Sequence, residues 1–418
     1  MLELYNTYKK YPNICTDSRN IKRNSIFFAL KGENFNGNKF AKEAIANGCK
    51  LAVIDDKEYH NKNTLLVENV LKCLQDLASF HRRKLNIPII GVTGTNGKTT
   101  TKELIYNVLS QRYTTYYTRG NLNNQIGVPL SILEIKESHE IAIIEMGASQ
   151  INEIDNLCKI AQPTLGLITN IGIAHMEGFK DNEGVIKAKT ELYNFIKENR
   201  GVVFVNSSDK LLKEKSNNIT RITYGNHLHS QYKTSIIKKF PFISIEAEEK
   251  SISSNLVGDF QHDNISTACC IGNYFNIPIE KIKKGVESYI PKNNRTEIVK
   301  TKRNYIILDA YNANPSSMNS MIDSFSQYKR ENKLCIIGDM LELGEYSKKE
   351  HNSIINKIQE VGIPAIYIGK EFCKYTSENA FENISFFQKN IEQFDLKDRT
   401  ILIKGSRSLR LERLIEHL

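Results

Sequence analysis

A glycine-rich turn between an apolar strand and a helix constrains this chain more than any other feature. Residues 89–102 read IIGVTGTNGKTTTK, and a helix is predicted to begin at or just after Lys98. Glycine lets the backbone approach an anion closely, and the amide groups at the start of a helix point towards it. The segment therefore predicts a phosphate-binding loop within a strand–loop–helix unit.

The residue types in this loop suit the phosphates of a nucleotide. Lys98 would neutralise the β- and γ-phosphates, and the Thr99 hydroxyl would reach Mg²⁺. The longer form of the phosphate loop has a glycine five residues before Gly97, where this chain has Val92, so the match is to the shorter TGTNGKT form. A glycine-rich turn that merely precedes a helix is the alternative. The residues expected to contact the nucleotide are Gly94, Thr95, Asn96, Gly97, Lys98, Thr99 and Thr100.

Three further side chains are candidates for the same site. Glu145 ends a predicted strand and could hold the metal ion beside the loop, although an ordinary strand-end acid is the alternative. His175 follows the next predicted strand, at the edge where open α/β sheets bind ligands, and could ligate a second metal ion or have a structural role. The spacing of Lys189 predicts only a solvated helical face.

The order of the predicted elements divides the 418 residues into three α/β domains. Residues 1–85 form a small mixed domain. Residues 86–290 alternate strands and helices, which predicts a parallel sheet covered on both faces, with an antiparallel edge within 226–255. Residues 291–418 form a second open α/β unit. The expected strands are 26–30, 51–54, 64–67, 87–92, 141–145, 165–169, 202–205, 305–309, 334–338, 365–368 and 401–404. The expected helices include 39–47, 70–84, 98–111, 151–161, 183–198, 264–275 and 409–418.

Composition narrows the classes of function. No run of about 20 apolar residues predicts a membrane span, and no apolar core behind a basic start predicts a signal peptide. The 8 cysteines form no CxxC pair, which predicts free thiols in a reducing cytoplasm and no zinc site. The net charge of +10 suits any anionic partner, and a solvated lysine-rich surface explains it equally well. Without an aromatic-studded basic stripe we expect no nucleic-acid partner, and we expect a monomer.

A series of strings, taken in order, resembles the Mur ligases, a family of ATP-dependent amide-bond ligases. The resemblance covers essentially the whole chain, excepting parts of 205–255 and 370–395. Two third-domain strings, DAYNANPSSM and IIGDMLELGE, are the most specific, and they are similar to the branch that joins D-alanyl-D-alanine to a UDP-linked muramyl tripeptide. The other strings are TDSRNIKRNSIFFALKGENFNGNKFAKEAIANG, TGTNGKTT, NLNNQIGVP, EMGAS, ITNIGIAHMEGF, KAKTELY and IKGSRS.

The resemblance implies a UDP-substrate domain, a central ATPase domain and a C-terminal Rossmann-like domain. ATP would phosphorylate the peptide carboxylate, and the amine of D-alanyl-D-alanine would attack the acyl phosphate to give an amide, ADP and phosphate. The implied cofactors are ATP and Mg²⁺, with Thr99 and Glu145 on one ion and His175 on a second. Lys189 matches a lysine that is carbamylated in many members, which would convert a cation into a metal-binding anion.

Further nucleotide contacts are implied by the same resemblance. Asn264 in GDFQHDN matches an asparagine that contacts the adenine, although Phe260 and Gln261 stand where the family usually has His and Asn. Arg295 matches an arginine that reaches the ATP phosphates from the third domain, and Asp309 matches the acid that binds the ribose. The alternatives are that Arg295 is an ordinary charged residue of a linker and that Asp309 only caps the end of a strand.

The implied substrate contacts fall into two groups. For the residues expected at the uridine nucleotide, the alternative is a Ser or Asp that starts a turn or a helix. For the Asn-Pro turn in the second group, the alternative is ordinary turn chemistry. The first group, expected at the uridine nucleotide, is Thr16, Asp17, Ser18 and Arg19. The second, expected at the peptide, the dipeptide or the cleft between domains, is Asn123, Asn312, Asn314, Pro315, Lys404 and Ser406.

Competing functions stay open at this point. A sister ligase that adds the third peptide residue would show a DNPR signature, which this chain lacks. A folylpolyglutamate synthase would lack the N-terminal module, and the ligases that add the first two residues would start with a glycine-rich Rossmann turn. An NTPase that does not ligate and a catalytically silent binder remain as alternatives of other classes. The third residue of the acceptor peptide, diaminopimelate or lysine, is not determined.

Overall fold

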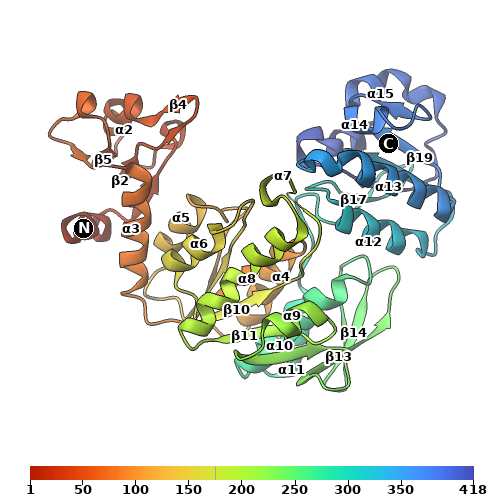
Figure 1. Cartoon of the computed structure of the whole chain (residues 1–418), viewed down its shortest axis with the longest axis horizontal. Coiled ribbons are helices and arrows are strands. Elements are labelled where there is room, and N and C mark those ends of the chain that lie inside the picture. The colour runs from red at the N-terminus through yellow and green to blue at the C-terminus, as the bar shows by residue number, and fades with distance from the viewer. Residues whose placement is uncertain (175) are drawn as a thin grey trace.

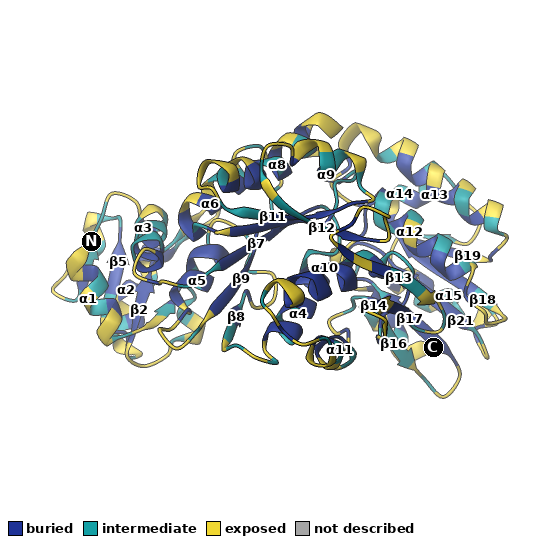
Figure 2. Ribbon diagram, turned by 90° about the horizontal axis from the view of Figure 1, so that it is seen from below, coloured by how far each residue is buried: buried dark blue, intermediate teal, exposed yellow. Residues whose placement is uncertain are grey.

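The computed structural model describes residues 1–174 and 176–418, and these form three α/β units that follow one another along the chain (Figure 1). The first and third units lie at opposite ends of the central unit in both ribbon views (Figures 1 and 2). The predicted fold class, three α/β domains with a parallel central sheet, is confirmed. The boundaries at residues 85 and 290 stay predictions.

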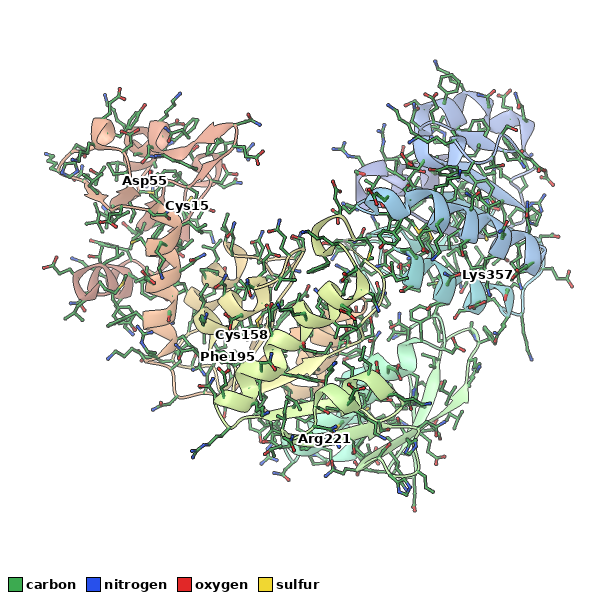
Figure 3. All side chains as sticks on the ribbon, in the orientation of Figure 1. Cys15, Asp55, Cys158, Phe195, Arg221 and Lys357 are labelled. Carbon is green, nitrogen blue, oxygen red and sulfur yellow. The ribbon has the colours of Figure 1, made fainter. Side chains whose placement is uncertain are left out.

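The first unit is a four-stranded parallel sheet in the order β1-β2-β5-β6, with short helices around it. Asp55, labelled in Figure 3, directly follows β5. It ties this sheet to the hairpin β3–β4 and the turn after it, since its Oδ1 pairs with Lys31 Nζ and accepts from Asn38 Nδ2, each at 2.9 Å. The strands are β1 (Asn13–Cys15), β2 (Ser25–Phe28), β3 (Lys31–Gly32), β4 (Phe35–Asn36), β5 (Leu51–Ile54) and β6 (Thr64–Leu66). The helices are α1 (Leu2–Lys10), α2 (Ala41–Ala46) and α3 (Val70–Arg82).

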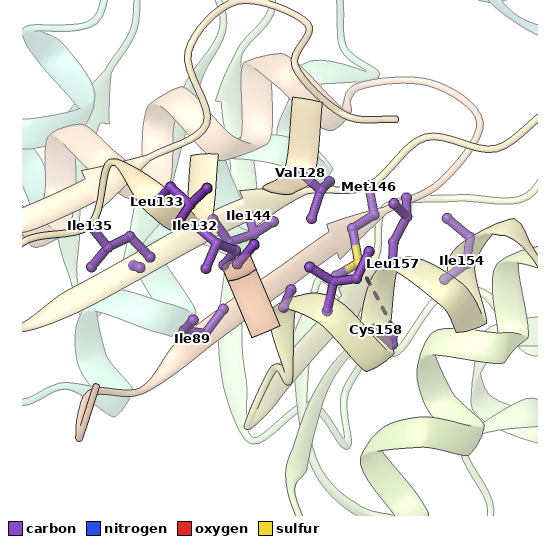
Figure 4. Close-up of a cluster of buried hydrophobic side chains, with 14 of the residues drawn as sticks. Ile89, Val128, Ile132, Leu133, Ile135, Ile144, Met146, Ile154, Leu157 and Cys158 are labelled. Carbon is purple, nitrogen blue, oxygen red and sulfur yellow. Dashed lines mark hydrogen bonds between the residues drawn. The ribbon is translucent and has the colours of Figure 1, made fainter. Parts of the chain in front are cut away.

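Helix α3 joins the first unit to the second. The side chain of Asn69 accepts from Lys72 N and caps its start. Leu74 and Leu77 of α3 share one buried cluster with side chains of the central unit, including Ile132. Figure 4 shows part of that cluster, in which Cys158 Sγ lies 3.9 Å from Met146 Sδ. The first two units therefore share a continuous hydrophobic core.

The central unit is a nine-stranded sheet in the order β15-β14-β13-β12-β11-β10-β7-β9-β8. Strands β7 to β13 are parallel, while β13, β14 and β15 form the antiparallel edge predicted within 226–255. The strands are β7 (Ile89–Thr93), β8 (Thr115–Tyr117), β9 (Ile141–Glu145), β10 (Leu165–Ile168), β11 (Val202–Asn206), β12 (Thr220–Gly225), β13 (Tyr232–Lys238), β14 (Ser244–Ala247) and β15 (Lys250–Ser253).

Helices cover both faces of the central sheet, so its strands are buried on both sides and read as continuous apolar runs (Figure 2). One face carries α5 (Gly127–Leu133), α6 (Glu153–Ala161) and α8 (Asn182–Glu198). The other carries α4 (Lys98–Leu109), α10 (Gln261–Tyr274) and α11 (Ile279–Glu287). The shorter α7 (Met176–Phe179) and α9 (Lys210–Lys215) complete the unit.

The third unit is a six-stranded sheet in the order β16-β17-β21-β18-β19-β20, parallel except for β16. Its strands are β16 (Glu297–Lys300), β17 (Tyr305–Asp309), β18 (Lys333–Gly338), β19 (Ala365–Ile368), β20 (Ala380–Phe381) and β21 (Thr400–Lys404). Its helices are α12 (Pro315–Ser326), α13 (Ser347–Val361), α14 (Lys370–Cys373) and α15 (Ile384–Asn390).

The end of the chain differs from the prediction. An α-helix was expected at 409–418, but Leu411–His417 is a 3₁₀-helix. Arg410 precedes it with a φ of 54°, which interrupts any helix that began earlier. The buried Leu411 and Leu414 are three residues apart, a spacing that a 3₁₀ turn satisfies as well as an α-helix does. Among the helices of the described residues, none has the length and apolar character to cross a membrane.

Candidate active site at the phosphate loop

The phosphate loop lies between β7 and α4, as the sequence predicts. Gly94 and Gly97 have φ values of 142° and 80°, a region that favours glycine. A Cβ on Gly94 would lie 2.0 Å from Thr169 Oγ1, so the loop packs directly on the end of β10. Thr95 N donates to Asn170 O at 2.9 Å, and Asn96 N donates to Asn170 Oδ1 at 3.0 Å. The end of β10 therefore holds the loop in shape.

Lys98 folds back onto the loop that precedes it. Its Nζ donates to the carbonyls of Gly94 at 2.7 Å and Thr95 at 3.0 Å. Burial lowers the pKa of Lys98; Glu145 opposes this change and Arg295 adds to it. The loop carbonyls stabilise the ammonium group of Lys98 only as dipoles. The negative charge of a bound polyphosphate would stabilise this group more strongly, so the site suits an anion.

Glu145, at the end of β9, is the centre of a buried polar cluster. Thr99 Oγ1 lies 3.0 Å from its Oε2, and Asn123 Nδ2 donates to its Oε1 at 2.9 Å. Lys102 Nζ lies 3.2 Å from Oε2. Burial alone would raise the pKa of Glu145, but the charges of Lys102 and Lys98 outweigh burial and hold it below its usual value. The carboxylate is therefore ionised and oriented towards Thr99.

Lys102 is a site residue that the sequence reasoning missed. Its side chain is fully buried, and its Nζ also donates to Gly120 O at 3.2 Å. A signal was present, because Lys98 and Lys102 are four residues apart and so share one face of α4. Asn170, which holds the loop through Asn96 N, was missed as well, since an asparagine after a strand reads as ordinary turn chemistry.

Asn264, at the start of α10, lies against the loop. A Cβ on Gly97 would lie 2.7 Å from its Oδ1, which already accepts from Thr101 Oγ1 at 2.9 Å. Its Nδ2 donates to Gln261 Oε1 at 2.7 Å. Gln261, which departs from the usual family pattern, thus orients the amide of Asn264 and faces the same cavity.

Lys189 is almost completely buried, although its spacing predicted a solvated face. Its Nζ donates to Ala148 O at 3.2 Å and lies 5.5 Å from the centre of the Phe179 ring. Burial, with a contribution from Lys98, lowers the pKa of Lys189 to about 7. A substantial fraction of this amine is therefore uncharged at neutral pH, which is the form that reacts with CO₂. His175, the other expected metal-site residue, lies outside the described residues.

The third unit brings a second set of charged groups to the loop. The guanidinium carbon of Arg295 lies 3.5 Å from the centre of the Tyr311 ring. Asp309 Oδ2 pairs with Lys404 Nζ at 2.5 Å, and its Oδ1 accepts from Thr296 N at 3.2 Å. This arrangement holds a cation and a carboxylate in the same hollow as the loop.

A cavity of about 1180 Å³ connects these groups. It runs from α3 and α6, past the phosphate loop and the ends of β9 and β10, to the ends of β17 and β21. Its wall includes side chains from all three units. The sequence-predicted residues among them are Thr95, Asn96, Gly97, Lys98, Thr99, Thr100, Asn123, Glu145, Asn264, Arg295, Asp309, Asn312, Asn314 and Lys404.

Family comparisons agree with this arrangement of units. The family model for the Mur ligase middle domain matches residues 92–272, that for the Mur ligase glutamate ligase domain matches 294–407, and that for the Mur ligase family catalytic domain matches 10–82. This chain belongs to the Mur ligase family. Members of that family are ATP-dependent ligases, and this Mur ligase is one of them.

Individual relatives of this Mur ligase are similar along almost their whole length. The UDP-N-acetylmuramoyl-tripeptide–D-alanyl-D-alanine ligase of Bacillus subtilis is 33% identical over 97% of this chain and 92% of the relative. The MurF crystal structure from Acinetobacter baumannii matches with a TM-score of 0.88 and 29% identity, over 97% of this chain and 93% of that one. MurF from Thermotoga maritima in complex with ADP matches with a TM-score of 0.85 and 26% identity, over 97% and 96%.

The uridine residues expected in the first unit lie apart from the cavity. Arg19 is exposed and forms an ion pair with Asp17, whose Oδ2 lies 2.8 Å from Arg19 Nη2. This pair lowers the pKa of Asp17 to about 2. Thr16 and Ser18 flank the acid, and none of these four residues belongs to the wall of the described cavity. A substrate that reached both places would have to span from the first unit to the phosphate loop.

Ser406, expected in the C-terminal cleft, has a different place. It is buried, and its Oγ accepts from Leu341 N at 3.1 Å. It therefore holds the loop after β18 and is not part of the cavity wall among the described residues. Lys404, two residues earlier, does reach the cavity through its pairing with Asp309.

Proposed function

We propose that this Mur ligase joins D-alanyl-D-alanine to UDP-N-acetylmuramoyl-tripeptide with hydrolysis of ATP to ADP and phosphate. The product would be the UDP-muramyl pentapeptide of peptidoglycan precursor synthesis, made in the cytoplasm by a monomeric enzyme. The single cavity that unites the phosphate loop with Arg295 and Asp309 carries the proposal, because amide-bond ligation needs ATP and two further substrates in one place. The names of the relatives favour this pair of substrates over others.

In the proposed first step, a carboxylate oxygen of the tripeptide attacks the γ-phosphorus of ATP. The bond between that phosphorus and the β,γ-bridging oxygen breaks, and ADP leaves with the electron pair. Both reactants are anions, so Lys98 and Arg295 act by neutralising their charge and by fixing the phosphates in line. Asp309 would bind the ribose and Asn264 the adenine.

The residues around Glu145 fit Mg²⁺. A carboxylate and a hydroxyl are the oxygen ligands that this ion prefers, and Thr99 Oγ1 lies 3.0 Å from Glu145 Oε2. Bound there, the ion would neutralise charge that develops on the phosphates. Lys189, carbamylated by CO₂, would supply an anion for a second ion with His175. Asn123 orients Glu145 through its hydrogen bond.

In the proposed second step, the amine of D-alanyl-D-alanine attacks the acyl carbon. The bond from that carbon to the phosphate oxygen breaks, and phosphate leaves with the electron pair while the amine loses a proton. We propose that the dipeptide binds beside Asn312, whose side-chain oxygen accepts from the adjacent Ala313 N at 2.9 Å and which lines the cavity. Ser18 and Arg19 would bind the uridine nucleotide at the other end of the substrate.

The decisive experiment measures phosphate release from ATP and Mg²⁺ with the UDP-muramyl tripeptide, with and without D-alanyl-D-alanine. Release that requires both substrates, with a pentapeptide product by mass, is the expected result. Running the assay with lysine-containing and diaminopimelate-containing tripeptides would determine the third residue. Release with a free diamino acid and the UDP-dipeptide instead would assign the chain to the sister ligase, and release with neither would refute ligation.

A further inference from the structure

Two asparagine side chains join the third unit to the phosphate loop. Asn314 Nδ2 donates to Asn96 Oδ1 at 2.7 Å, and Asn96 Nδ2 lies 3.4 Å from Asn314 Oδ1. Asn96 is in the loop that starts α4, whereas Asn314 caps α12 of the third unit. The two amides therefore form a reciprocal bridge across the cavity between units that are distant in the sequence.

The loop side of this bridge is rigid. Asn96 N donates to Asn170 Oδ1 at 3.0 Å. Its carbonyl accepts from Thr169 Oγ1 at 2.6 Å and from Asn170 Nδ2 at 3.0 Å. Because the backbone of Asn96 is bonded in both directions to the end of β10, its side chain is a fixed anchor. A group that binds this side chain takes its position from the phosphate loop.

A second contact lies beside the bridge. Ser316 Oγ, in the first turn of α12, accepts from Ile173 N at 3.2 Å. A Cβ on Gly172 would lie 2.6 Å from Ser316 Oγ, so only glycine leaves room for this approach. Gly172 N in turn donates to Thr95 Oγ1 at 3.0 Å. The first turn of α12 thus rests on a surface made by the loop and the segment after β10.

The bridge lies close to the nucleotide-site groups of the third unit. β17 ends at Asp309, and residues 310–313 lead directly from it to Asn314. Arg295 stacks on Tyr311 in that connection, with 3.5 Å from its guanidinium carbon to the ring centre. A contact that fixes Asn314 against the loop therefore also fixes how far Arg295 and Asp309 stand from Lys98.

We propose that Asn314 is a positioning residue for the nucleotide, which holds Arg295 and Asp309 over the phosphate loop through its bridge to Asn96. Both ends of its amide are engaged, because Oδ1 also accepts from Ser317 N at 2.9 Å as the cap of α12. Of the places expected for Asn314 from the sequence, this role corresponds to the cleft between domains. This inference rests on one part of the proposed function, namely that the enzyme binds ATP.

The test is a double-mutant cycle read as the Kd for ADP in Mg²⁺ by titration calorimetry. Asn314→Ser keeps an oxygen that can cap α12 but is too short to reach Asn96. Asn96→Ala removes the other amide and leaves the backbone bonds of the loop. We expect each single variant to weaken ADP binding by roughly 3- to 10-fold, the range for one lost hydrogen bond. The double variant should bind no more weakly than the weaker single variant, because one bridge is lost only once.

Asn383→Ser is the matched control. Asn383 caps α15 in the same unit, accepting from Phe386 N at 2.9 Å, and it is not part of the cavity wall. The control variant keeps an oxygen that can cap α15, as Asn314→Ser does for α12, and should leave the Kd for ADP unchanged. Unchanged ADP binding in Asn314→Ser, additive losses in the double variant, or an equal loss in the control would each overturn the proposal. An enzyme that binds ADP in this way yet makes no pentapeptide would refute only the proposed function.

Discussion

The ammonium group of Lys102 lies 3.2 Å from Oε2 of Glu145, and the two side chains are only 0% and 2% exposed. The carboxylate that is expected to face the metal ion thus has its own counter-charge within the protein. A buried ion pair contributes little net stability, but removing one partner leaves an uncompensated charge away from water. The pair therefore couples the stability of the central unit to the geometry of its site.

Replacing Lys102 by methionine should lower the free energy of unfolding by roughly 3–5 kcal/mol, because the buried Glu145 would lose the cation in direct contact with it. Chemical denaturation followed by circular dichroism measures the loss. Lys250→Met is the control, since it breaks an exposed pair with Glu280 at 3.0 Å and should change the stability far less. Equal losses of stability in the two variants would contradict this prediction, because removing one partner of the buried pair would then cost no more than removing one partner of the exposed pair.

Lys98→Ala should reduce ATP-dependent ligation by at least about 10²-fold, because it removes a cation aimed at the phosphates. The fold should persist, since the lost bonds are to two loop carbonyls and no core group is removed. Phosphate release and a thermal melt of the same sample test both statements. Near-normal turnover in this variant would remove the phosphate-loop assignment.

Arg295→Ala should raise the KM for ATP or lower kcat, by about 10²-fold in kcat/KM, while UDP-substrate affinity stays nearly unchanged. Arg295 lies in the cavity beside Tyr311, on the side of the third unit, whereas the uridine motif of the first unit is not part of the cavity wall. Steady-state kinetics with each substrate varied in turn separates these effects. An equal loss of affinity for the UDP-substrate would contradict the placement of Arg295 at the ATP phosphates.

Activity should depend on CO₂ through Lys189. Since burial lowers the pKa of this lysine to about 7, the uncharged amine that reacts with CO₂ becomes more abundant as the pH rises through 7. Ligation should therefore fall in CO₂-depleted buffer, most strongly below pH 7, and recover with bicarbonate. A ¹³C carbamate signal from labelled bicarbonate should vanish in Lys189→Ala and persist in Lys187→Ala, which changes an exposed lysine of the same helix.

The stability of the third unit should fall as the pH is lowered through His351. This ring is buried, with Nδ1 at 2.8 Å from Ser347 O and Nε2 accepting from Met340 N at 3.2 Å, so it is neutral. Burial lowers its pKa from 6.5, although the nearby Asp339 opposes the change. Below about pH 6.5 the unfolded chain binds a proton that the folded chain does not, so this contribution is present above pH 6.5 and is lost below it.

The melting temperature of the wild type at pH 7.5 and 5.5 measures this loss. His351→Gln removes the titrating ring, so its stability should depend less on pH than that of the wild type. Burial also lowers the pKa of His81, but His81 is present in both proteins. The difference between their pH dependences of stability therefore reports on His351. Identical pH dependence in the two proteins would refute this assignment.

Secondary-structure elements whose signals are local could be predicted from the sequence. The strand, glycine turn and helix of residues 89–102 are neighbours in the chain, so spacing alone predicted the loop, and the apolar runs at β9, β17 and β19 predicted those strands. Short elements such as β8 (Thr115–Tyr117) and α5 (Gly127–Leu133) escaped prediction, because their few residues carry no clear period. The predicted α-helix at 409–418 was wrong for a related reason, because the spacing of Leu411 and Leu414 suits a 3₁₀-helix as well as an α-helix.

Contacts between residues that are distant in the chain could not be predicted in this way, because they depend on how the units pack. Lys189 looked like a solvated lysine because helical spacing records its neighbours on α8 and not what covers them, and it is buried with Ala148 O as its partner. Lys102 became the counter-ion of Glu145, and Asn314 became the partner of Asn96, through sheet order and the docking of the third unit. The pattern of residue types along a chain predicts the secondary structure and which face of each element is buried. Which distant residues contact each other depends on how the whole chain packs.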